Sequence, residues 1–297
     1  MNLDRSAAGP QGHAAGREGV AAAPPRLGIL GVVLALLAAP TACTVWGRST
    51  VASGGAQRSV WSKSYVLTGP AKFALTSDAG GVQLEPGAAN RLQVDVRGRG
   101  SSLQDLHWTL SEEQQGNRVT IHLRRESETW GLGEAPQIIV ELPQHSSAAI
   151  TLGGGDITAA GLDGNLKLTS GGGGISVRGF NGGLTAATGG GGIKASGVFS
   201  ALRLQAGAGG IQVNVHSGSV MRKDWRLNTG AGAIEARLPT ELRASLRLNV
   251  GLGGIQCDLP GLDTTRSSGN ELDGELNGGG YRLSVATGTG GIRITAR

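Results

Sequence analysis

Cysteine, aromatic residues and charged residues are all scarce in this sequence, and each scarcity excludes a class of protein. Cysteine occurs only twice in 297 residues, too rarely for a disulfide framework, and Cys43 and Cys257 lie in such different settings that we expect no bond between them. Aromatic residues make up 3% and charged residues 16% of the chain. Hydrophobic residues still reach 39%, so the composition is not that of a disordered protein.

Long apolar runs are also missing, because the longest, residues 27–39, would span only about 20 Å as a helix. This length favours the apolar core of a signal peptide over a membrane span. The run ends in Pro40-Thr41-Ala42-Cys43, which resembles the lipobox of bacterial lipoproteins, although Pro40 stands where Leu is usual. The resemblance implies a signal peptide over residues 1–42 and lipidation at Cys43; the alternative is an ordinary signal peptide with an incidental cysteine.

Glycine is the residue that the sequence has in excess, with 53 glycines against ten prolines. Collagen is excluded, because it needs glycine at every third position and abundant proline. Helical architecture is disfavoured, because each interior glycine costs about 1 kcal/mol relative to alanine. The composition predicts a β protein with many tight turns.

A repeat is visible when the chain is aligned on isoleucines that follow glycine clusters. These anchors are Ile157, Ile175, Ile193, Ile211, Ile234, Ile255 and Ile292. Apolar residues recur nine and seven residues before each anchor, and most positions two residues after it are apolar as well. Glycine always stands four residues before it. The first four anchors are spaced by 18 residues.

This pattern predicts stacked rungs, each made of two short strands joined by a glycine corner. Positions two residues apart share one face of a strand, and glycine permits backbone conformations that other residues avoid. A unit of 18 residues cannot bury its own apolar face, but a stack of such units can. We therefore predict an all-β fold, a β-solenoid or β-helix of rungs of about 18 residues; a sandwich of antiparallel hairpins is the rival arrangement.

The domain organisation follows from where the repeat is regular. Residues 43–57 are rich in Gly, Ser and Ala and are expected to be a tether. Residues 58–150 hold strand-like alternation and one imperfect copy of the repeat, which predicts a β-rich cap of degenerate rungs. Residues 151–297 are the regular repeats. Insertions fall at one edge of the stack, and the longest, about Pro260 to Gly280, is expected to be a flexible loop.

The motif Leu-x-Leu-x-Ser/Thr-Gly-x-Gly-x-Ile-x-Val, repeated over roughly residues 70–297, resembles the bacterial adhesin-like family of Gly-rich β-strand repeats. The resemblance implies an exported, envelope-associated β protein and carries over no catalytic residues. This chain departs from the family in one respect. The Asp that often precedes the anchor is present only as Asp156.

No motif predicts a cofactor, a metal site or an active site. Calcium needs six to eight converging oxygen ligands, and Asp156 is the sole acid in its column. The cluster Asp263, Glu271, Asp273 and Glu275 is interpreted as a solvated loop. Gly189–Lys194 lacks the Gly-Lys-Ser/Thr of a phosphate-binding loop, and the histidines lack zinc spacing. Cys257 occupies an inward column and is interpreted as a small buried hydrophobic residue.

A row of basic residues at outward positions is the one candidate site. It comprises Lys167, Arg203, Arg226, Arg247 and Arg282. Stacked in register, these residues would form a ladder for anionic envelope polymers; the alternative is a solvated face whose like charges discourage aggregation. No aromatic residues interleave with them, so we expect no specific nucleic-acid partner.

Three hypotheses of function remain. The first is an exported, non-enzymatic β-solenoid, anchored in the membrane through lipidated Cys43 on the periplasmic or cell-surface side, that acts in adhesion or envelope interactions. The second is a structural or regulatory envelope module that stacks on a protein partner. The third, a polysaccharide-active solenoid enzyme, would have to place its chemistry in the excursions at 216–224 and 260–280.

Overall fold

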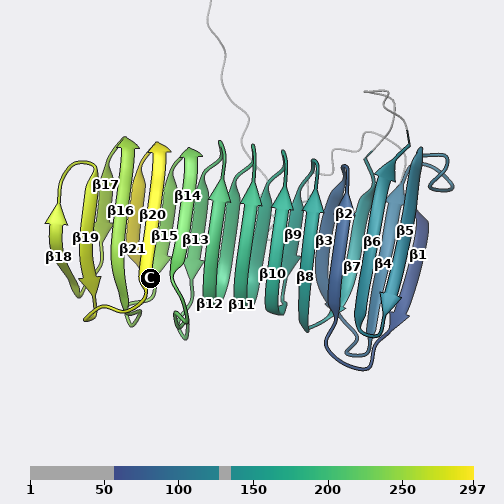
Figure 1. Cartoon of the computed structure of the whole chain (residues 1–297), viewed down its shortest axis with the longest axis horizontal. Coiled ribbons are helices and arrows are strands. Elements are labelled where there is room, and N and C mark those ends of the chain that lie inside the picture. The colour runs from purple at the N-terminus through teal and green to yellow at the C-terminus, as the bar shows by residue number, and fades with distance from the viewer. Residues whose placement is uncertain (1–56, 127–134) are drawn as a thin grey trace, which may run out of the picture. The chain divides into compact units, whose positions relative to one another are not determined.

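The computed structural model describes residues 57–126 and 135–297. All of them belong to the second of the two units, Ser53–Arg297, into which the chain divides. The expected signal peptide, Cys43 and all of the expected tether but Gln57 lie outside the described residues. Within the described part the chain forms 21 strands and no helix, so the all-β prediction is confirmed (Figure 1).

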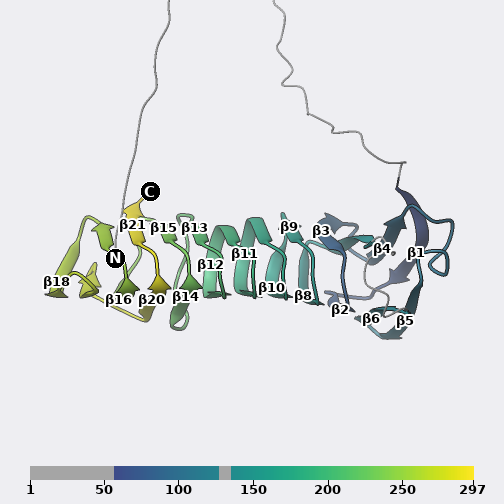
Figure 2. The same ribbon diagram turned by 90° about the horizontal axis from the view of Figure 1, so that it is seen from above.

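The strands form two layers that run side by side along the stack (Figure 2). Layer A contains, in spatial order, β5 (Trp108–Gln115), β6 (Arg118–Arg125), β2 (Lys72–Ser77), β8 (His145–Leu152), β10 (Asp163–Ser170), the second halves of β11 (Ile175–Thr188) and β12 (Ile193–Ala206), β14 (Trp225–Ala231), β20 (Arg282–Thr289), β16 (Ala244–Leu252), β19 (Glu271–Leu276) and β18 (Leu262–Ser267).

Layer B is assembled in the same way, and its central strands are those that follow the glycine corners. Its order is β1 (Arg58–Val66), β4 (Arg91–Gly98), β7 (Gln137–Pro143), β3 (Gly81–Gly87), β9 (Ile157–Ala160), the first halves of β11 and β12, β13 (Ile211–Val215), β15 (Ile234–Leu238), β21 (Ile292–Ala296) and β17 (Ile255–Asp258).

The central strands pair in parallel with the repeat columns in register. Ile175 lies opposite Ile157 on one side and Ile193 on the other, and Leu184 lies between Leu166 and Leu202. These side chains are buried, whereas the residues that alternate with them point outward. The core is therefore a set of aliphatic columns between the two layers, as the period-2 pattern predicts.

The glycine corners are sterically required. A Cβ on Gly173 would lie 2.0 Å from the Gly155 carbonyl oxygen, and one on Gly191 would lie 2.3 Å from that of Gly173. Buried hydroxyls close the same corners: the Thr188 hydroxyl donates to the Gly173 carbonyl at 2.6 Å and accepts from the Gly191 amide at 3.2 Å. Each such hydroxyl satisfies two backbone groups and ties one corner to the corner below it.

The order of the strands in space differs from their order in the chain at both ends of the stack. The first repeat, β2 and β3, lies between β6/β7 and β8/β9. The last, β20 and β21, lies between β14/β15 and β16/β17. Within the described residues the outermost parallel strands therefore come from neither the first nor the last repeat.

The insertion from Pro260 to Gly280 is ordered, so the prediction of a flexible loop is wrong. It forms β18 and β19, an antiparallel hairpin, and β19 pairs with β16. Leu276 is buried in the core and Leu272 packs against it. The hairpin covers the layer A edge of the stack, and this explains why a Gly-rich polar segment is structured.

The two ends of the stack differ in how well they are closed. At the first end Tyr65 and Trp108 are buried, Lys63 and Tyr65 both hydrogen-bond to Glu112, and Arg125 lies over the Trp108 ring at 5.3 Å. Burial and the neighbouring Glu112 raise the pKa of Tyr65. Burial opposes ionisation of Glu112, but the hydrogen bonds from Lys63 and Tyr65 outweigh it and lower the pKa of Glu112.

At the other end β17 pairs only with β21 among the described residues. Ile255 and Cys257 are half-buried there, and Leu252 is 71% exposed. Cys257 is thus at an open edge rather than in the interior. Burial, together with the nearby Asp258, raises the pKa of Cys257 to about 11, so its thiol stays protonated near neutral pH.

Candidate polyanion-binding face

The outer surface of layer A carries the predicted basic residues. Lys167, Arg203, Arg226 and Arg247 occupy exposed outward positions of β10, β12, β14 and β16. Arg203 and Arg226 are direct neighbours on adjacent strands. Thr185 separates Lys167 from Arg203.

The predicted row is not continuous, because the last repeat is inserted ahead of the one that precedes it in the chain. Ser284 of β20 lies between Arg226 and Arg247. Arg247 has Asp273 of the covering hairpin on its other side. Arg282 lies beside Ser245 of β16, outside the row that contains Arg226. The structure therefore brings Arg203 and Arg226 together and places Arg247 apart from them, between Ser284 and Asp273.

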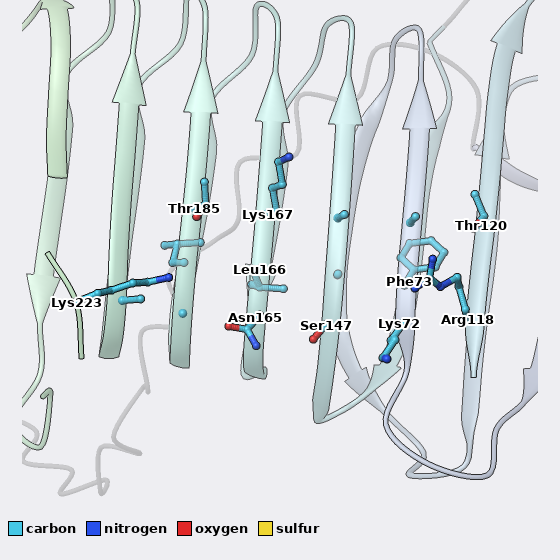
Figure 3. A pocket seen from close by; sticks show the side chains of 16 residues that line it. Lys72, Phe73, Arg118, Thr120, Ser147, Asn165, Leu166, Lys167, Thr185 and Lys223 are labelled. Carbon is cyan, nitrogen blue, oxygen red and sulfur yellow. The ribbon is translucent and has the colours of Figure 1, made fainter. Parts of the chain in front are cut away.

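Three further cations lie near the predicted ones on this face and were not identified from the sequence. Lys72 of β2 and Arg118 of β6 are in-register neighbours. Lys223 comes from the excursion at 216–224 and reaches across the face toward the strand that carries Thr185 (Figure 3). The position of Lys72 in the imperfect repeat could have identified it. Arg118 could not have been found, because its strand joins the stack out of sequence order.

A groove runs across the strands of this face. One part, of about 430 Å³, is lined by residues that include Lys72, Arg118, Lys167 and Lys223 (Figure 3). An adjoining hollow of about 520 Å³ is lined by Arg203, Arg226, Asp224 and Tyr281, among others. The two share Leu184, Thr185, Ala201 and Lys223, so they form one continuous depression, hereafter the layer A groove.

Acidic residues are nearly absent from the strands that form the floor of the groove. From β6 to β16 in layer A only Asp163 is acidic, and it lies 3.1 Å from His145 Nδ1. Asp224, which lines the hollow, accepts a hydrogen bond from the Arg282 backbone amide at 2.9 Å. The cations of this face outnumber these two acids, which gives the groove a positive potential.

The outer surface of layer B has cations too, but acids accompany them. From β7 to β17 its basic residues are Arg178, Lys194, Arg237 and Arg293, and its acidic residues are Glu85, Glu141, Glu235 and Asp258. Glu235 lies directly opposite Arg293 and also accepts a hydrogen bond from Gln212 at 3.4 Å. Among the central strands, the surplus of cations over acids is therefore confined to layer A.

One aromatic residue accompanies the arginines, contrary to the sequence-based expectation. Tyr281 lines the layer A groove together with Arg203 and Arg226 and is 51% exposed. Tyr281 directly precedes Arg282 and belongs to none of the repeat columns. An alignment of the outward positions therefore does not include it.

Nothing in the described residues resembles a metal centre or a membrane span. No group of three or more His, Cys, Asp or Glu side chains there could hold a metal ion. Over residues 57–126 and 135–297 no helix is long and apolar enough to cross a membrane. His216, at the start of the excursion, has a pKa lowered by burial and by the charge of Arg297, and its Nε2 lies 2.9 Å from the Ser196 hydroxyl.

A family model described as Toastrack DUF4097 matches residues 71–295. This range includes the strands from β2 to β20 and most of β21. No relative was found among curated proteins.

Three solved structures that align with this chain share little sequence with it. A proposed cell adhesion protein from Clostridium sporogenes ATCC 15579 and a proposed adhesin from Bacteroides fragilis NCTC 9343 are each 10% identical, cover 80% of this chain and 99% and 96% of their own, and align with a TM-score of 0.35. A proposed lipid-binding protein from Parabacteroides distasonis ATCC 8503 is 11% identical, covers 79% of this chain and 96% of its own, and has a TM-score of 0.30. At these scores the likenesses carry no argument about function.

Proposed function

This chain belongs to the Toastrack DUF4097 family, and from that premise we propose that it is a non-enzymatic binding module of the bacterial cell envelope whose layer A groove holds anionic envelope polymers. Each repeat of a layer A strand, a glycine corner and the following layer B strand acts as one rung of a β-solenoid. The rungs supply a rigid scaffold, and the outward side chains supply the binding surface.

The uneven distribution of charge over the two layers carries this proposal. Lys72, Arg118, Lys167, Arg203 and Arg226 face one groove, with almost no acid on the strands beneath them. A solvated face needs only scattered charge of both signs, as layer B has. A one-sided surplus raises the local concentration of anions and speeds their association.

The location of the module rests on the N-terminal sequence. Residues 1–42 as a signal peptide and lipidation at Cys43 would place the stack at the membrane surface, with residues 43–57 as its tether. Mass spectrometry of the mature N-terminus tests this arrangement. A diacylglyceryl-modified Cys43 is the expected result, and an unmodified N-terminus at another residue would refute the anchor.

The binding function is tested by neutralising cations on one layer at a time. Arg203, Arg226 and Lys223 are changed to Gln together, and the control changes Arg178, Lys194 and Arg237 of layer B to Gln, so that both variants lose the same formal charge. We expect the layer A variant to bind anionic envelope polymers at least about tenfold more weakly, since each lost contact with a charged group contributes on the order of 1 kcal/mol. The control should bind within about twofold of the parent. Equal losses in both variants would show that only net charge matters.

A second candidate function is supported by the open end of the stack. Strand β17 has an unpaired edge within the described chain, beside exposed Leu252, and such edges pair readily with another chain. A structural module that stacks on a protein partner would use this end. Leu252→Asp should then abolish recovery of the partner from envelope extracts, whereas Val66→Asp, equally exposed at the other end, should not.

A further inference from the structure

We infer that the ligand of the layer A groove is a linear polysaccharide with sparse acidic groups, lying across the strands with one sugar ring against Tyr281. This inference rests on the proposed function and adds to it the chemical class of the ligand. Three features of the groove support it: the spacing of its cations, the small residues of its floor and the exposed aromatic ring near one end.

The cations form three groups, the pair Arg118 and Lys72, then Lys167, then the pair Arg203 and Arg226, and a layer A strand without an outward Lys or Arg separates each group from the next. Lys72 of β2 and Lys167 of β10 are separated by β8, and Lys167 and Arg203 of β12 are separated by β11. With neighbouring strands about 4.8 Å apart, successive groups lie about 9.6 Å apart across the strands. This interval is close to the length of a disaccharide, so it suits a chain with one acidic group on every second sugar.

The strands between these cations present little side-chain volume. The outward residues that line the groove on these strands are Ser147 and Ala149 of β8 and Gly183 and Thr185 of β11, all of them small. The resulting depression can receive a ring that lies flat between two charged side chains. A polyanion without rings gains nothing from such a floor.

Tyr281 supplies a contact that charge alone does not explain. Its ring is half-exposed and lines the same hollow as Arg203, Arg226 and Lys223. The face of an aromatic ring is electron-rich, so it attracts the polarised C–H groups on the apolar face of a pyranose. An exposed aromatic ring beside cations is therefore suited to an acidic sugar chain.

A membrane surface fits the groove less well. Lipid headgroups lie in a plane, and a protein docks on them through cations that project from its surface, together with apolar side chains that insert. Here Lys72, Lys167 and Arg203 border a recess of about 430 Å³ and its extension. The shape favours a chain over a plane.

The test compares three anionic probes on the full chain and two variants. The probes are hyaluronan, which has one carboxylate per disaccharide, inorganic polyphosphate, and vesicles containing phosphatidylglycerol. Tyr281→Ala should weaken hyaluronan binding about fivefold and leave polyphosphate binding within about twofold. Tyr281→Phe, which keeps the ring and removes the hydroxyl, should bind hyaluronan like the parent.

Each other outcome is decisive. If Tyr281→Ala leaves hyaluronan binding unchanged, or weakens polyphosphate binding equally, the sugar contact is refuted while the basic groove stands. Binding to vesicles but not to hyaluronan would also refute it and assign the face to the membrane. Failure of the parent to bind any of the three probes would refute the proposed function itself.

Discussion

The two layers are built from the same repeats, yet their outer surfaces differ in charge. Layer A carries cations with almost no acid on its central strands, whereas layer B pairs its cations with acids such as Glu235. Their inner surfaces are alike, with aliphatic columns buried in register. Inward residues and corners meet the packing demands of the stack, whereas outward residues face solvent. A one-sided charge pattern on the outward residues is therefore not explained by packing of the core.

The largest expected effect comes from breaking the corner that joins the two layers. Gly173→Ala would place a Cβ 2.0 Å from the Gly155 carbonyl oxygen, whereas a Cβ on neighbouring Gly172 has nothing within 4 Å. Because a backbone atom in a rung cannot move aside alone, we expect Gly173→Ala to lower the free energy of unfolding by about 3 kcal/mol or more. Gly172→Ala should change it by less than about 0.5 kcal/mol. Urea unfolding measures both, and similar losses would contradict the steric role of the corner.

Removing a hydrogen bond within the corner should lower the free energy of unfolding by less than the steric clash at Gly173 does. Thr188→Val removes the hydroxyl that serves both the Gly173 carbonyl and the Gly191 amide. We expect a loss of about 1–3 kcal/mol, because two backbone groups lose a buried partner. Thr185→Val makes the same chemical change on the exposed side of the same strand and should be nearly neutral. Thermal unfolding compares them; a neutral Thr188→Val would mean that the hydroxyl is dispensable.

The smallest expected effect comes from removing one charge from a pair of facing residues on each layer. Arg226 lies directly opposite Arg203, whereas Glu235 lies opposite Arg293. Like charges on facing residues destabilise a sheet and opposite charges stabilise it. Arg226→Gln should therefore raise the free energy of unfolding by a few tenths of a kcal/mol at low salt, and Glu235→Gln should lower it by as much. Both changes should vanish in high salt; changes of the same sign would remove the distinction between the layers.

The sequence predicts the middle of the stack well and its ends poorly. The 18-residue spacing places Leu166, Leu184 and Leu202 on successive strands, and the structure pairs them in register. Local alternation suffices there, because each repeat contacts the repeat that follows it. At the ends, β20 contacts β14 and β16 through pairings that no period encodes. That rearrangement interrupts the basic row at Ser284.

The candidate groove was also predictable only in part, because some of its residues join it through pairings or connections that the repeat does not encode. Lys167, Arg203 and Arg226 lie in one repeat column and can be read from the sequence. Arg118 joins the face through β6, which pairs with the earlier strand β2. Lys223 and Tyr281 come from segments between repeats. The repeat columns identify residues that occupy equivalent positions in successive strands. The groove also contains residues from the connections between repeats, which the columns do not include.

Insertion of the last repeat between two earlier ones has a mechanical consequence. In an ordinary stack, tension on the final residue would peel one rung at a time from a free end. Here a pull on Arg297 would have to draw β21 from between β15 and β17, breaking two ladders at once. The terminus would therefore resist the pull in shear, with the hydrogen bonds of two ladders loaded together, instead of opening one hydrogen bond at a time.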